Sequence, residues 1–97
     1  MGPAIANPLI KVRVGRIFVR VTQEDIDRGV RNAASCCPVA LAIKRMGFEA
    51  IHVWNSRTSF LDPQADEFIH RDLPPKAIAF VTAFDAKQPV KPTKFHI

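Results

Sequence analysis

Residues 38–61 read PVALAIKRMGFEAIHVWNSRTSFL and decide the fold class. Pro38 suits the first position of a helix, because it has no amide hydrogen to lose there. The apolar body that follows ends in a basic turn and Gly47, which is a typical helix stop. From Phe48 the pattern changes to an alternation with a period of two, in which Ala50, His52 and Trp54 alternate with Ile51 and Val53, as in a half-buried strand. A buried helix followed directly by a strand predicts a mixed α and β domain.

Downstream of this strand, the chain continues to alternate and to turn. Three alternating segments predict strands, over 48–54, 57–61 and 67–71. Asn55 and Ser56 are turn-forming residues and separate the first two strands. Consecutive strands with short connections pair with one another, so we expect a three-stranded antiparallel meander.

The last third of the chain predicts a helix and an extended tail. Pro74 and Pro75 suit a helix entry, and residues 75–86 repeat apolar side chains at helical spacing. The final stretch, 87–97, contains two more prolines and is expected to be extended.

Upstream of the central helix, β-branched residues alternate with Lys and Arg. This pattern predicts strands over 9–14 and 16–22. Thr22 can begin a short helix, because its hydroxyl accepts from a first-turn amide, and Gly29 is expected to end it. A loop over 30–35 then leads into the central helix.

These elements predict one α+β domain spanning 1–97. We expect a small antiparallel sheet with two to three helices packed on one face, an irregular N-terminal arm at 1–8 and an extended C-terminal tail at 87–97. The length allows one core, and the 47% hydrophobic and 24% charged fractions are typical of a globular domain. A domain of 97 residues is marginally stable, so we also expect a homo-oligomer.

Composition and spacing argue against several classes of function. The longest apolar stretch, from Val39 to Ile43, is far too short to cross a bilayer, and the first residues do not resemble a secretory signal. We therefore expect a cytoplasmic protein with no membrane partner. Cys36 and Cys37 are adjacent and cannot cross-link distant segments. The scattered histidines lead us to expect no metal and no cofactor.

Cys37 directly precedes the Pro38 helix, whose dipole would favour a thiolate, although a buried structural cysteine is commoner. Nucleophilic catalysis would also need a base, and the spacing brings none of the three histidines to this thiol. We therefore expect no catalytic residues and no enzyme.

Positive charge is unevenly distributed along the chain. There are 14 Lys and Arg against nine Asp and Glu, and the whole net charge of +5 lies in residues 1–48. A basic face that attracts phosphate groups is one interpretation. The alternative is a solvated strand face whose charges discourage edge pairing. The expected members of the basic face are Lys11, Arg13, Arg16, Arg20 and Arg28.

The loop before Pro38 is the expected anion-binding corner. A helix N-terminus presents unpaired amides and a partial positive charge, and Arg31, Asn32 and Ser35 could complete a pocket for phosphate there. Asn32 and Ser35 can equally be local caps. No glycine-rich phosphate-binding motif occurs.

Trp54 and Arg57 form a second candidate pair, for holding a nucleobase. An indole offers a stacking surface and a guanidinium offers a cation beside it. The alternative is that this single tryptophan belongs to the core.

Five blocks of the sequence resemble the signature blocks of small orphan proteins encoded by bacteriophages. The blocks are Thr22-Gln-Glu-Asp-Ile-Asp-Arg-Gly29, Cys37-Pro-Val-Ala-Leu-Ala42, Leu73-Pro-Pro75, Phe80-Val-Thr-Ala-Phe-Asp85 and Pro89-Val-Lys-Pro92. The resemblance implies no activity and carries over no binding residues. It implies an accessory protein that acts in the cytoplasm of a bacterial host, where such proteins often bind and neutralise a host component.

Three functions follow as hypotheses. The first is a non-enzymatic protein that binds a phosphate-bearing ligand and sequesters a nucleotide signal of host defence, with Arg31, Asn32, Ser35, Trp54 and Arg57 as its ligand residues. The second is a nucleic-acid-binding protein that uses the basic N-terminal half. The third is an inhibitor that covers an acidic surface of a host protein.

Overall fold

The computed structural model describes residues 15–97 and has an α+β fold, as the sequence predicts. The irregular arm at 1–8 and the strand predicted over 9–14 lie outside the described residues. The elements, in chain order, are β1 (Phe18–Val21), α2 (Gln23–Arg28), α3 (Pro38–Arg45), β2 (Glu49–Val53), β3 (Arg57–Asp62), β4 (Glu67–Asp72), α4 (Pro75–Asp85) and β5 (Thr93–His96).

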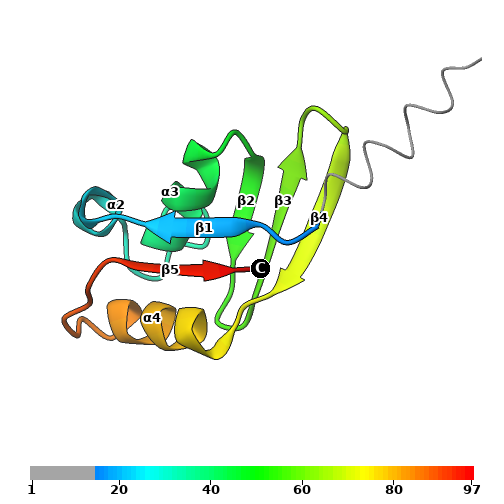
Figure 1. The fold of residues 1–97 in the computed structure, drawn as a ribbon. Helices are drawn as coiled ribbons and strands as arrows, with labels where there is room; N and C mark the ends of the chain where they lie inside the picture. Colours follow the sequence, from blue (N-terminus) through cyan, green and yellow to red (C-terminus); the bar gives the residue numbers. More distant parts are fainter. Residues whose placement is uncertain (1–14) are drawn as a thin grey trace, which may run out of the picture.

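The strands divide between two antiparallel sheets. β2, β3 and β4 form the predicted three-stranded meander, and β1 pairs with β5 in a separate two-stranded ribbon. Figure 1 shows this ribbon running across the direction of the meander strands. The tail predicted to be extended thus holds a strand, and the two ends of the described chain lie side by side. A pairing between residues so far apart in sequence leaves no local signal.

α3 lies in the core and contacts β1, β2 and α2. Five of its residues are buried, Pro38, Val39, Ala40, Ala42 and Ile43, so the prediction of a buried helix is confirmed. The core extends into both sheets through side chains that are almost fully buried, including Val19 of β1 and Phe60 of β3. No helix of the described residues is long and apolar enough to span a membrane.

Two glycines limit the helices for different reasons. Gly47 follows α3 with a φ of 102°, a left-handed conformation that favours glycine, as the predicted stop requires. Gly29 follows α2 with a φ of −69°, so backbone handedness does not require glycine there. A Cβ at this position would lie 2.6 Å from the ring of Pro38, and glycine is therefore needed for the close approach of the two helices.

Candidate functional site

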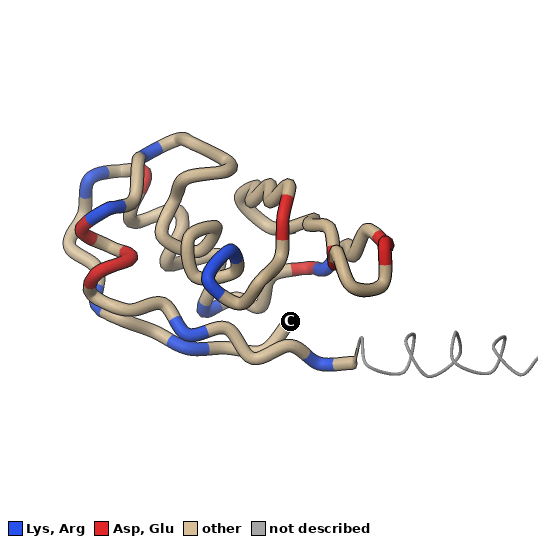
Figure 2. Tube along the Cα trace, turned by 90° about the horizontal axis from the view of Figure 1, so that it is seen from above, with Lys and Arg blue, Asp and Glu red and all other residues tan. Residues whose placement is uncertain are grey.

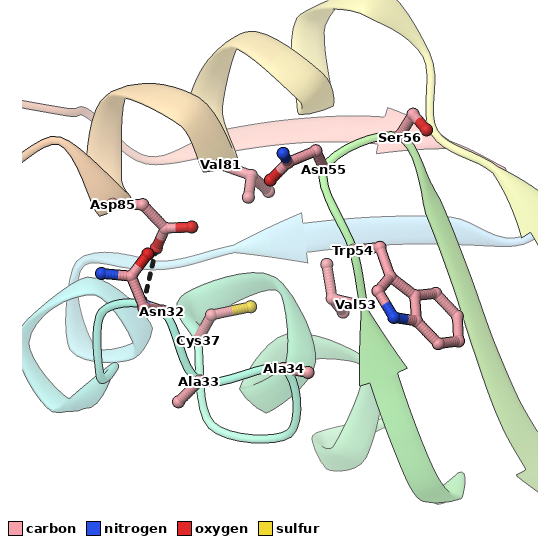
Figure 3. A pocket seen from close by; sticks show the side chains of 10 residues that line it. All are labelled: Asn32, Ala33, Ala34, Cys37, Val53, Trp54, Asn55, Ser56, Val81 and Asp85. Atoms are coloured by element: carbon pink, nitrogen blue, oxygen red, sulfur yellow. Dashed lines mark hydrogen bonds between the residues drawn. The ribbon is translucent and has the colours of Figure 1, made fainter.

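The predicted ligand residues do not form one pocket. A pocket of about 390 Å³ lies beside the start of α3 (Figure 3). Of the five predicted ligand residues, all within the described range, only Asn32 and Trp54 line it. Ser35 lines a different pocket, next to β2.

The pocket in which the sequence predicts a phosphate group is lined by the carboxylate of Asp85. Asp85, at the end of α4, lines this pocket, and its Oδ1 accepts a hydrogen bond from the backbone amide of Asn32 at 2.9 Å. No Lys or Arg is among the described residues that line the pocket. Because a fixed negative charge repels an anion, this arrangement does not support phosphate binding at the start of α3.

Trp54 is exposed, so the alternative interpretation, that this single tryptophan belongs to the core, is wrong. Its relative exposure is 52%, and its indole stacks on the ring of His52 at a centroid distance of 5.9 Å. Figure 3 shows the indole pointing away from Asp85 and Cys37. Trp54 therefore does not offer its ring to a ligand in this pocket.

The two arginines of the predicted ligand set have other neighbours. The guanidinium of Arg31 lies 5.5 Å from the ring centroid of Phe84, in a cation–π contact. Nε of Arg57 lies 3.7 Å from a carboxylate oxygen of Asp72 on the next strand. Neither arginine lines the pocket at the start of α3.

Cys37 is buried at the start of α3, whereas Cys36 is exposed. Burial raises the pKa of the Cys37 thiol, and the nearby charge of Asp85 raises it further, against the lowering effect of backbone hydrogen bonds from α3. The raised pKa disfavours the thiolate that the helix dipole was considered to promote.

The predicted basic face is only partly assembled. Arg16 and Arg20 lie on or next to β1 and are exposed. Arg28 lies on α2, where it pairs with Glu24 at 3.3 Å. Lys11 and Arg13 lie outside the described residues.

The pairing of β1 with β5 places cations beside cations. Ile17 and Ile97 exchange both backbone hydrogen bonds, at 2.9 and 2.8 Å. In an antiparallel ladder the next pair is not hydrogen-bonded, and its side chains come closest together. The non-hydrogen-bonded pairs of the ribbon are Phe18–His96 and Arg20–Lys94. Two like charges directly opposite each other destabilise a sheet, so this pair costs the fold some stability.

These side chains share one exposed surface, because the residues that alternate with them, such as Val19 and Phe95, are buried in the core. We call it the ribbon face, and it consists of Arg16, Phe18, Arg20, Lys94 and His96. Figure 2 shows blue positions but no red ones along β1 and β5. Within residues 15–97, no carboxylate forms an ion pair with a cation of the ribbon face.

Two further cations bind the backbone of the ribbon. The Arg45 guanidinium donates to the carbonyl oxygen of Arg20 at 2.8 Å, and the Lys76 ammonium donates to that of Lys94 at 3.0 Å. Each carbonyl belongs to the non-hydrogen-bonded pair and therefore points away from the partner strand. A cationic side chain thus lies at each edge of the ribbon, although the charge of Arg45 is balanced by its ion pair with Asp25.

A depression opens at the Arg20–Lys94 end of the ribbon. Its volume is about 380 Å³, and no Asp or Glu is among the described residues that line it. Besides the two cations, it presents the side chains of Thr22, Gln23 and Thr93. Hydroxyl groups beside two cations are donors suited to a phosphate group, whereas the side-chain amide of Gln23 already donates to a carboxylate oxygen of Asp27 at 2.9 Å.

Sequence reasoning missed Phe18, Lys94 and His96 as site residues. The alternation of polar and apolar residues over Thr93–His96 was the available signal, but the neighbouring prolines obscured it. No group of three His, Cys, Asp or Glu side chains that could hold a metal ion occurs within residues 15–97.

Comparison with known proteins identifies no relative: no protein-family model, no curated protein and no solved structure matches this chain. The resemblance to bacteriophage orphan proteins therefore stays a prediction.

Proposed function

We propose that the protein is a non-enzymatic binder of single-stranded nucleic acid and that the ribbon face holds the phosphate backbone. The observation that carries the proposal is the Arg20–Lys94 pair, two cations directly opposite each other on an exposed surface without a described carboxylate partner. A bound phosphate would relieve their repulsion and accept hydrogen bonds from both.

The aromatic pair of the ribbon face favours a single strand over a duplex. Phe18 is 45% exposed, and its ring centroid lies 5.1 Å from that of His96. Arg16 and Arg20 flank Phe18 along the strand. Exposed rings between cations can stack on unpaired bases while the cations follow the backbone, whereas the bases of a duplex are already stacked on each other.

The test compares two double variants that remove the same charge. Arg20→Ala/Lys94→Ala truncates the opposed cations, and Arg28→Ala/Arg57→Ala truncates two arginines that already have carboxylate partners. Fluorescence anisotropy with a labelled single-stranded oligonucleotide at low salt measures the affinity. We expect roughly tenfold weaker binding for the first variant and little change for the second. Equal losses in both variants would contradict a site on the ribbon face.

A second candidate function is the binding of a small phosphate-bearing molecule, such as a nucleotide signal of host defence, and the depression beside Arg20 and Lys94 favours it. Its residues differ from those expected from sequence, because Asp85, at the end of α4, lines the pocket beside the start of α3. A saturable thermal shift with a nucleotide, lost in Arg20→Ala/Lys94→Ala, would support this function. If neither oligonucleotide nor nucleotide binds, the acidic surface of a host protein remains as the predicted partner.

A further inference from the structure

β4 is an edge strand with an identifiable set of backbone groups on its open side. Among the strands of the described residues it pairs with β3 only, and the amide of Leu73 donates to the carbonyl of Ser56 at 2.8 Å. Along a strand, the backbone N–H and C=O groups of successive residues point alternately to the two neighbouring strands. Counting from Leu73, whose groups point toward β3, those of every second residue of β4 point away from β3. The residues whose backbone groups face the open edge are Phe68, His70 and Asp72. Within residues 15–97, no other strand pairs with this edge.

The open edge is complementary to itself in one register. An antiparallel pair of β4 strands related by a two-fold axis at Ile69 places Glu67 of each copy opposite Arg71 of the other. It also places Phe68 opposite His70. By symmetry each contact occurs twice. The Glu67–Arg71 positions are non-hydrogen-bonded, which brings their side chains closest together.

The neighbouring register is not complementary. A two-fold axis at His70 would place Phe68 opposite Asp72 and Ile69 opposite Arg71, so no opposite charges would meet. In the register centred on Ile69 the pairing would end at Glu67, because Asp66 has a φ of 52° and is not extended. Charge therefore favours the register centred on Ile69 over the register centred on His70.

We propose that a second copy of the chain docks on the open edge of β4, in the register centred on Ile69, and joins the two meanders into one continuous six-stranded sheet. The edge carries an exposed phenylalanine, Phe68 at 56%, which pairing would cover. The Arg71 guanidinium donates to the carbonyl of Gly15 at 3.0 Å, which holds this side chain at the edge of the meander.

Oligomeric mass tests the proposal on the full chain. Native mass spectrometry and light scattering after size exclusion should show a dimer of the wild type. Glu67→Lys places two cations opposite each other at both ends of the interface and should give a monomer. Glu49→Lys makes the same charge change at an exposed position of β2, away from this edge, and should remain dimeric.

Two further experiments test the backbone pairing and the charge pairing separately. Phe68→Pro removes an amide that faces the open edge and leaves the bonds to β3 intact, so it should also be monomeric with an unchanged circular dichroism spectrum. Glu67→Lys mixed with Arg71→Glu should form a heterodimer, because the introduced lysine then faces the introduced glutamate and the native Arg71 of one copy faces the native Glu67 of the other. A monomeric wild type at every concentration overturns the proposal. So does a dimer that survives both Glu67→Lys and Phe68→Pro.

Discussion

Two adjacent cysteines lie in opposite environments, and only one of them is coupled to folding. Cys36 is exposed, while Cys37 is buried against the core and has a raised pKa. A thiol whose pKa is higher in the folded than in the unfolded chain stabilises the fold below its unfolded pKa, and this contribution is lost as the pH rises. The ordinary pKa of a cysteine thiol is 9.0, so the loss begins near that pH.

We therefore predict that part of the stability lost above pH 9 depends on Cys37. Thermal or urea unfolding at neutral and alkaline pH, compared between wild type and Cys37→Ala, measures this part as a difference between the two pH dependences. Cys37→Ala should be less stable at neutral pH because it leaves a cavity, but it should lose less stability at alkaline pH. Cys36→Ala is the matched control and should keep the wild-type dependence; an unchanged dependence in Cys37→Ala would contradict the prediction.

At the scale of elements, one carboxylate joins two helices. Asp25 accepts from the amide of Thr22 at 2.9 Å, while the Thr22 hydroxyl accepts from the amide of Asp25 at 3.2 Å, which completes a capping box at the start of α2. The same carboxylate is only 5% exposed and forms an ion pair with Arg45 of α3. Its removal would weaken the cap of one helix and the attachment of the other.

Asp25→Ala should lower the free energy of unfolding by about 2 kcal/mol, because it removes a cap interaction and the hydrogen bonds to a charged partner. The estimate is moderate because Arg45 is half exposed and can be solvated when its partner is gone. Urea unfolding measures the change. Asp27→Ala, on the exposed side of the same helix, should cost much less; equal costs would show that the contact with Arg45 contributes nothing.

Elements with local signals could be predicted from sequence, and those that depend on distant pairing could not. The cap at Thr22, the proline at the start of α3 and the alternation of the meander each act within a few residues, and the elements they predict, α2, α3 and β2 to β4, are present. β5 owes its existence to β1, more than 70 residues away, so its residues could only be recognised as extended. The same is true of the candidate site. Arg20 lies on a strand that the sequence predicts, whereas Lys94 becomes a site residue only because β5 pairs with β1.

For the whole molecule, net charge alone does not locate a binding site. The sequence places the excess of +5 upstream of Glu49, yet two cations of that half form ion pairs with carboxylates of the same chain. Arg28 pairs with Glu24, and Arg45 pairs with Asp25. What remains on the ribbon face is Arg16 and Arg20, joined by Lys94 from the half of the chain with no net charge. The affinity for nucleic acid should therefore depend on the cations of the ribbon face and not on the net charge of the protein.

The salt dependence of binding distinguishes these two possibilities. Each phosphate contact with a single strand contributes about −0.7 to the slope of log K against log salt, so the three cations of the ribbon face predict a slope of about −2. Arg20→Ala/Lys94→Ala should reduce the slope to roughly −0.7, because one of the three contacts remains. Arg28→Ala/Arg57→Ala lowers the net charge equally and should leave the slope near the wild-type value, since its arginines contact carboxylates of the same chain. Anisotropy titrations across a series of salt concentrations give all three slopes. If both double variants reduce the slope equally, the protein attracts nucleic acid through its overall charge, and the ribbon face is not a site.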